Sequence, residues 1–156
     1  MTLTLRPARL SDLHVLNHIK ESAVRDSTAP GSPLTARLHR WNPKRSYAGP
    51  RYWRNAIVAE VDGVGGRQVV GVAKTIGAML KDLWVLHSAR SHGAGAALAR
   101  AAEDRIRADG HRMAHLYTAA FNARTLAFYE RNGWTLVRFT QHAVGHFRRC
   151  VYVKRL

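Results

Sequence analysis

Acidic residues are scarce in this sequence of 156 residues, and cysteine is almost missing. Asp and Glu total 10 against 25 Lys and Arg, which gives a formal net charge of +15. A protein with such a field concentrates anions near its surface, and nucleic acids, phosphorylated cofactors and acidic membranes all qualify. The charge therefore predicts an anionic partner without naming its class, and a basic surface that serves only solubility is the other explanation.

The single cysteine, Cys150, excludes an internal disulfide and a zinc site built from thiolates. No apolar run approaches the ~20 residues that span a bilayer, and the N-terminal stretch lacks the apolar run of a secretion signal. We therefore expect one cytoplasmic domain over residues 1–156 and no membrane partner. Two histidine pairs have i,i+4 spacing without a neighbouring carboxylate or thiolate, so we expect no metal: His14 with His18, and His142 with His146.

Alternating and β-branched residues predict strands at 3–5, 56–61, 68–76, 80–86, 113–118, 134–140 and 147–156. Ser11 is the expected N-cap of the first helix. That helix carries apolar residues along one side: Leu13, Leu16, Ile19 and Ala23. The order of strands and helices predicts an α+β or mixed α/β sandwich built on a central sheet.

Two later helices are predicted from their apolar spacing and their end signals. The longer one buries one side: Leu98, Ala102 and Ile106. We expect Glu103 and Arg107 to be exposed as an i,i+4 ion pair, and Gly110 to end this helix. The shorter helix is expected to begin at the cap Asn122 and to end at Gly133.

The residues from Arg90 to Gly95 read Arg-Ser-His-Gly-Ala-Gly and lie between a predicted strand and a predicted helix. The first N–H groups of a helix are unpaired and carry about half a positive charge, so they bind anions that can approach closely. Gly93 and Gly95 permit that approach, while Arg90 and Ser91 add a cation and a hydroxyl donor. A P-loop is excluded because no Gly-Lys-Ser/Thr follows, and a Rossmann fingerprint lacks its third glycine and acidic residue. A phosphate site and a plain glycine turn both stay open on these residues alone.

The stretch LWVLHSARSHGAGAAL resembles the acetyl-CoA-binding signature of the GNAT superfamily of N-acetyltransferases. In that signature Arg/Gln-x-x-Gly-x-Gly/Ala follows a Leu-aromatic-Val strand, and the matching residues here are Arg90, Gly93 and Gly95. His87 and Ser91 stand where the family more often has proline and glycine. The stretch NARTLAFYERNGW resembles a second family segment and supplies its residues in register: Asn122, Thr125, Phe128, Tyr129, Gly133 and Trp134.

The two motifs occur in the family's order, and the resemblance covers roughly Val69 to the C-terminus. It implies a single GNAT acetyltransferase domain of α/β (α+β) class. In that fold a central mixed, mostly antiparallel sheet of six to seven strands is flanked by about four helices.

The resemblance also implies the cosubstrate and the residues that bind it. Family members use acetyl-CoA and pass its acetyl group directly to a primary amine. The diphosphate of CoA would bind the loop and helix start: Arg90, Ser91, His92, Gly93, Ala94, Gly95 and Ala96. The pantetheine arm would run along Leu83, Trp84 and Val85, where a backbone N–H would stabilise the developing oxyanion.

The resemblance implies Tyr129 as the general acid that protonates the departing CoA sulfur. The ordinary pKa values of a phenol, ~10, and a thiol, ~8.5, are close enough for an inexpensive proton transfer. Asn122 would bond the pantetheine or an ordered water. Direct transfer needs no enzyme nucleophile, so Cys150 is expected to fill the core.

The general base is not evident, because the two positions where the family often has a glutamate hold Met79 and Tyr117. Asp82 is near, but alternation along the strand directs it to the face opposite Met79. Without a base, an α-amino group of pKa ~8 is easier to deprotonate than a lysine of pKa ~10.4, which favours an acceptor of low pKa. Three residues stay open as bases acting through water: Glu21, Asp26 and His115.

The segment 37–54 interleaves six cations with four aromatic residues: Arg37, Arg40, Lys44, Arg45, Arg51 and Arg54 with Trp41, Tyr47, Tyr52 and Trp53. Such a pattern grips phosphates and stacks bases, which favours an acidic or nucleic-acid-bearing acceptor such as an aminoacyl-tRNA. A solvated basic loop with aromatics in the core is the alternative explanation. A non-catalytic, basic nucleic-acid-binding module is the alternative function, and a homodimer also stays open.

Overall fold

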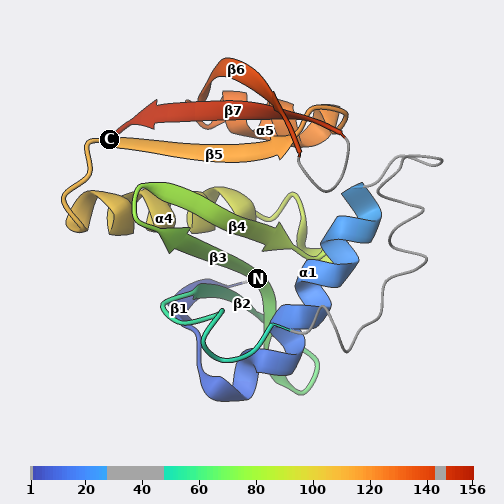
Figure 1. Ribbon diagram of the computed structural model, residues 1–156. Helices are drawn as coiled ribbons and strands as arrows, with labels where there is room; N and C mark the ends of the chain where they lie inside the picture. The colour runs from blue at the N-terminus through green and yellow to red at the C-terminus, as the bar shows by residue number, and fades with distance from the viewer. Residues whose placement is uncertain (1, 28–47, 143–146) are drawn as a thin grey trace.

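The computed structural model describes residues 2–27, 48–142 and 147–156 (Figure 1). Its centre is a seven-stranded sheet in the order β1-β2-β3-β4-β5-β7-β6. The strands are β1 (Leu3–Pro7), β2 (Ile57–Gly63), β3 (Gly66–Ile76), β4 (Met79–Val85), β5 (Met113–Ala119), β6 (Thr135–Gln141) and β7 (Arg148–Arg155). The helices are α1 (Leu13–Ser27), α4 (Ala94–Ala108) and α5 (Ala123–Arg131), with short 3₁₀ helices at Leu10–Asp12 and His87–Ala89. The predicted central mixed sheet is confirmed.

Strands β4 and β5 are the one parallel pair in the described part of the chain, and the other neighbouring strands run antiparallel. A single bridge, Met79 with His115, joins them, and the His115 N–H donates to the Ala78 carbonyl at 3.0 Å. Beyond this point the two strands diverge toward their C-terminal ends (Figure 1). One edge of β4 therefore has no strand beside it, and a wedge opens in the middle of the sheet.

The helices pack on the two faces of this sheet. Leu98 and Ile106 of α4 belong to one core, to which α5 also contributes. Leu16 and Ile19 of α1 belong to a second core with Val72 of β3. Within the described ranges, no helix combines the length and the apolar character that a membrane crossing requires.

The start of α1 differs from the prediction, because Ser11 is not its cap. The chain enters through the 3₁₀ turn, where the Asp12 carboxylate accepts a hydrogen bond from the Arg9 backbone N–H at 2.7 Å. The same carboxylate accepts two bonds from Arg6, at 2.8 and 2.9 Å, and these hold the pKa of Asp12 below its ordinary value. Asp12 thus closes the 3₁₀ turn as its N3 residue, and the described contacts give Ser11 no capping role.

The expected ion pair between Glu103 and Arg107 is wrong. Glu103 is buried, and its carboxylate accepts hydrogen bonds from Trp134 Nε1 at 3.1 Å and from Lys154 Nζ at 2.9 Å. Arg107 pairs with Asp104 instead, at 2.6 Å. The partners of Glu103 come from segments far along the chain, which helical spacing cannot reveal. The caps at Asn122, Gly110 and Gly133 agree with the prediction.

Strand β4 contains one residue more than the stretch of β3 beside it. Leu80 and Asp82 pair with consecutive residues of β3, so Lys81 between them forms a bulge. The bulge reverses the alternation and places Asp82 on the face that α1 covers, together with Met79. The prediction that Asp82 faces away from Met79 is therefore wrong.

Candidate active site

A groove of about 770 Å³ lies where β4 and β5 diverge. Its walls come from the end of β4, the turn before α4, the end of β5, and α5. Most of the predicted cofactor and catalytic residues line it: Leu83, Trp84, Val85, Arg90, Ser91, Gly93, Gly95, Ala96, Asn122 and Tyr129. His92 and Ala94 do not, because His92 points to solvent and Ala94 is buried beneath the helix start.

The start of α4 offers unpaired backbone donors to this groove. Gly93 is the N-cap with a positive φ of 80°, and no side chain caps the helix. The Ala97 N–H donates to the Gly93 carbonyl at 3.0 Å, and the N–H groups of residues 94–96 have no backbone acceptor within the described ranges. Ser91 also has a positive φ, 70°, a conformation that costs a residue with a side chain about 1–2 kcal/mol. An anion is the usual partner of donors in this arrangement.

Gly95 has a packing role beside the predicted one. A Cβ atom at this position would lie 3.3 Å from the Phe128 ring of α5. A side chain would therefore push α4 away from α5. Gly93 shapes the corner through its backbone conformation, and Gly95 shapes it through the contact between two helices.

The Arg90 side chain fastens the turn to its neighbours. Its Nε donates to the Val85 carbonyl at 3.3 Å, and its Nη2 donates to the Asp26 carboxylate at the end of α1, also at 3.3 Å. The predicted cation is thus present at the groove, but part of its bonding capacity holds the turn against β4 and α1.

Asn122 and Tyr129 face the groove from opposite ends of α5. Asn122 Oδ1 accepts a hydrogen bond from the Thr125 N–H at 3.2 Å, which confirms the predicted cap. Tyr129 is buried, and this burial, with a smaller effect of the Asp82 charge, raises the pKa of its phenol above the ordinary value. The phenol therefore stays protonated at working pH. Proton transfer to a thiolate is less favourable than the ordinary pKa values imply.

A buried network that sequence reasoning missed lies on the α1 face. Asp82 accepts hydrogen bonds from the Tyr52 hydroxyl at 2.5 Å and from Trp84 Nε1 at 2.8 Å, and Lys20 Nζ lies 3.4 Å away. Lys74 Nζ lies 3.5 Å from the centre of the Tyr52 ring. Burial lowers the pKa of Lys74 and raises the pKa of Tyr52. The network orients the Trp84 indole. In the sequence, the sign of a buried charge network was Lys74, a cation within a strand of β-branched residues.

The end of the groove near the β6–β7 turn is aromatic and basic. The rings of Phe121 and Phe147 have their centres 5.7 Å apart. Arg149 of β7 pairs with Ala119 of β5, and its guanidinium lies 4.8 Å from the centre of the Tyr117 ring. Its Nε is buried without a hydrogen-bond partner among the residues described, and such a donor costs about 1–3 kcal/mol. Sequence reasoning missed Arg149 because alternation along β7 does not distinguish it from other basic residues.

Proton-accepting groups are few in the groove. Asp26 is the one carboxylate among its described lining residues, and it pairs with Arg90. Met79 and Tyr117 line the groove but carry no carboxylate. Cys150 is fully buried in the core, as predicted. The described residues contain no group of three or more His, Cys, Asp or Glu side chains that could hold a metal ion.

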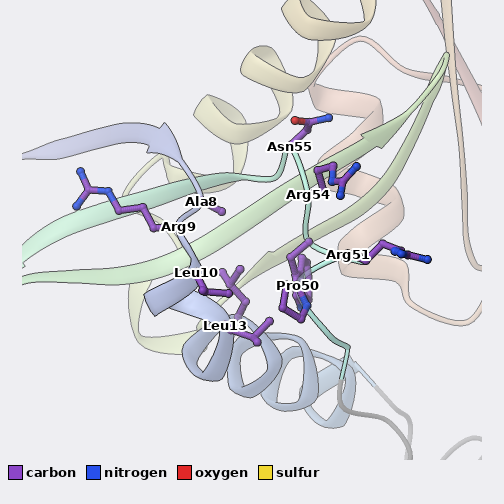
Figure 2. A pocket seen from close by; sticks show the side chains of 10 residues that line it. Ala8, Arg9, Leu10, Leu13, Pro50, Arg51, Arg54 and Asn55 are labelled. Carbon is purple, nitrogen blue, oxygen red and sulfur yellow. The ribbon is translucent and has the colours of Figure 1, made fainter.

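A second hollow, of about 550 Å³, lies at the start of α1 (Figure 2). Figure 2 shows its apolar and basic lining: Ala8, Leu10, Leu13 and Pro50 with Arg9, Arg51 and Arg54. None of the predicted cofactor or catalytic residues lines it. The groove at the wedge is therefore the candidate active site.

The basic segment 37–54 is described from residue 48 onward. Trp53 is buried and Tyr52 belongs to the network, so both aromatic residues pack inside the protein. Arg51 and Arg54 are exposed. Residues 37–47, which carry the rest of the predicted pattern, lie outside the described residues.

A model of the acetyltransferase (GNAT) family matches residues 16–134. The match includes both sequence motifs and the whole turn before α4. A comparison with curated protein sequences gives no match.

Several solved structures are similar to this chain. The PaiA N-acetyltransferase from Thermoplasma acidophilum, in complex with coenzyme A, has a TM-score of 0.73 at 15% identity, with 100% of both chains covered. YncA from Salmonella typhimurium, with its cofactor acetyl-CoA, has a TM-score of 0.72 at 16% identity, covering 100% of this chain and 95% of that one. The ribosomal-protein-S18-alanine N-acetyltransferase from Escherichia coli has a TM-score of 0.67 at 19% identity, covering 99% and 94%. Likeness at these identities shows a common fold.

Proposed function

The chain belongs to the acetyltransferase (GNAT) family, and on that premise we propose that it transfers an acetyl group from acetyl-CoA directly to a primary amine. The observation that carries this proposal is the wedge between β4 and β5, which opens beside the uncapped start of α4. Acetyl-CoA has a long arm with two amides and a diphosphate. It therefore needs a free strand edge and an anion site side by side.

The residues at the wedge fit this cosubstrate. The backbone of Leu83, Trp84 and Val85 would bond the amides of the pantetheine arm, as in strand addition. The N–H groups of residues 94–96 would hold the diphosphate. A backbone N–H of β4 would stabilise the oxyanion that develops on the carbonyl as the amine attacks the thioester. Acetyl-CoA itself supplies the activated acetyl group.

Tyr129 is the proposed general acid. As the carbon–sulfur bond breaks, its hydroxyl donates a proton to the departing sulfur. The raised pKa keeps the proton on the phenol until negative charge develops on that sulfur. The side-chain nitrogen of Asn122 can donate to the pantetheine or to a water while its oxygen caps α5.

An amine of low pKa is the proposed acceptor. At pH 7 a lysine of pKa ~10.4 is neutral about once in 2,500 molecules, whereas an α-amino group near ~8 is neutral about once in ten. Because positions 79 and 117 hold Met and Tyr and no carboxylate, the enzyme depends on the fraction of the amine that is already neutral in solution. The acidic limb of kcat/KM should then follow the pKa of the free amine, and a limb far below that pKa would show that a base had been missed.

Binding of acetyl-CoA is the first test. A ligand present at a thousand times its Kd stabilises the folded state by about 4.1 kcal/mol, which raises Tm by several degrees. Isothermal calorimetry should give one site per chain, and release of free thiol should require an added amine. A protein that neither shifts its Tm nor releases thiol would contradict the proposal.

An acceptor that carries nucleic acid, such as an aminoacyl-tRNA, stays a prediction of the charge. The alternative function, a nucleic-acid-binding module without chemistry, gains no support from the family match. Filter binding of tRNA across a salt series tests both, because phosphate contacts give a steep salt dependence. Absence of binding at low salt removes both. A cytoplasmic location and a homodimer stay predictions as well.

A further inference from the structure

Arg149 is a half-buried cation that the mechanism above does not use. It lines the end of the groove that also contains Phe121 and Phe147, and its guanidinium carbon lies 4.8 Å from the centre of the Tyr117 ring. Its Nε is buried and has no acceptor in the described parts of the chain. A guanidinium presents its N–H donors as a planar fork. Because the buried Nε is out of reach from the groove, a ligand there would meet the outer N–H groups, for which no acceptor is found among the described residues.

The charge around Arg149 indicates the sign of that partner. Five cations line the groove: Lys81, Arg90, Arg124, Arg131 and Arg149. Asp26 is the one carboxylate among the described lining residues, and it already pairs with Arg90. An acceptor that carries a negative charge would therefore complement Arg149.

This inference rests on the proposed function. We infer that Arg149 binds the carboxylate of the acceptor, and that the acceptor is a single amino acid with a free carboxyl group. The planar fork of N–H groups in a guanidinium matches the two oxygens of a carboxylate. Phe121 and Phe147 form an apolar wall at the same end of the groove, which suits an apolar or aromatic side chain. The acceptor amine then lies one carbon from the anchored carboxylate.

The same contact assists deprotonation in a site without a base. In a free amino acid the negative carboxylate stabilises the neighbouring ammonium group and raises its pKa. Arg149 neutralises that carboxylate, so the pKa of the bound amine falls. Arg149 acts as a specificity residue, and its effect on the amine is electrostatic. A purely structural arginine would have no such effect on ionisation in the bound complex.

The test measures thiol release from acetyl-CoA with the common L-amino acids, each compared with its own carboxamide. Rates are compared per free amine, because amidation changes the amine's pKa. We expect the best amino acid to exceed its carboxamide in kcat/KM by about 10- to 100-fold, the range of a hydrogen bond to a charged group. O-phosphoethanolamine is added to the panel as an amine that carries a phosphate instead.

Two variants locate the effect. Arg149→Met should lower kcat/KM for the best amino acid by about 10- to 100-fold, with a much smaller loss for its carboxamide. It should also move the acidic limb of kcat to higher pH, since kcat reports the bound complex. Arg148→Met is the matched control, because Arg148 is exposed and stacks on Phe139 outside the groove. The control should keep both constants, and the acetyl-CoA-induced rise in Tm should persist in both variants.

The outcomes separate this inference from the function on which it rests. If acetyl-CoA binds but no amino acid exceeds its carboxamide, or O-phosphoethanolamine is preferred, the carboxylate assignment is overturned and the acetyltransferase proposal stands. Equal losses in Arg148→Met and Arg149→Met would also overturn it. If acetyl-CoA does not bind at all, the proposed function itself fails.

Discussion

The two sides of the groove are built from different material. The proposed cofactor side consists mainly of backbone: the free edge of β4, the glycine turn and the first N–H groups of α4. The proposed acceptor side consists of side chains from segments far apart in the sequence, among them Tyr117, Phe147 and Arg149. Backbone donors suit a cosubstrate that is the same in every family member. Side chains can vary one at a time, so the acceptor side is where a family with a common fold can diversify.

The largest expected effect comes from the buried Asp82 network on the α1 face, which orients Trp84. Asp82→Ala removes the partner of Tyr52 and Trp84 and leaves the buried cation of Lys74 without compensation. We expect the free energy of unfolding in urea to fall by about 3–5 kcal/mol. The control Asp62→Ala breaks an exposed pair with Arg67 and should cost at most about 1 kcal/mol. Similar losses in the two variants would mean that the buried Asp82 network contributes no more to stability than an exposed ion pair.

The next effect tests Tyr129 as the general acid between the two sides of the groove. Tyr129→Phe removes the proposed acid and should lower kcat by about 100-fold, the low end of general acid catalysis, without changing the Kd of acetyl-CoA. Tyr152→Phe is the matched control: Tyr152 is also buried, but its hydroxyl donates to Glu130 at 3.0 Å. Stopped assays at saturating substrate measure both. A Tyr129→Phe enzyme with full kcat would remove Tyr129 from the mechanism.

A smaller effect tests the backbone side alone. Gly93→Val places a side chain at a positive φ, which costs about 1–2 kcal/mol, and the turn must shift. The KM for acetyl-CoA should rise about tenfold, while the KM for the amine stays the same. Gly65→Val is the control in the β2–β3 hairpin, where φ is 91° and, as at Gly93, no atom lies within 4 Å of an added Cβ. Gly65→Val should lose comparable stability and keep both KM values. A rise in the amine KM of Gly93→Val would contradict the separation of the groove into a cofactor side and an acceptor side.

The smallest effect is a pH dependence of stability that arises from buried lysine and tyrosine side chains. Burial lowers the pKa of Lys74 in the folded state, so between that pKa and ~10.4 the unfolded chain binds more protons. Stability should therefore rise with pH in this window. Above pH ~10 it should fall, because burial raises the folded-state pKa values of Tyr52 and Tyr129. Urea unfolding from pH 7 upward measures both limbs, and Lys74→Met should flatten the rising one; an unchanged slope would contradict the assignment.

The elements that form the proposed cofactor side could be predicted because their signals are local. Gly93, Gly95 and the cap Asn122 act within a few residues of their place in the sequence, so spacing alone locates the turn and the start of α5. The strands followed from alternation for the same reason. Ser11 failed as a cap because the chain enters α1 through a 3₁₀ turn, which Asp12 closes with the help of Arg6 from β1.

The side-chain contacts of the proposed acceptor side and of the buried charges could not be predicted, because they join distant segments. The Asp82 partners Lys20 and Tyr52 come from α1 and from the turn before β2. Glu103 likewise meets Lys154, which is 51 residues away. A single sequence marks such residues only as charges in unexpected places, as Lys74 was within its strand.

The bulge at Lys81 has a consequence for how the β3–β4 hairpin finds its alignment. The tight turn at Gly77 and Ala78 sets Ile76 opposite Met79, and unbroken alternation from there would send Asp82 toward the apolar core under α4. Burial of the Asp82 carboxylate among apolar side chains would cost several kcal/mol. A β3–β4 hairpin without the bulge is therefore disfavoured during folding. The charge of Asp82 thus favours the alignment of β3 and β4 in which β4 contains one extra residue.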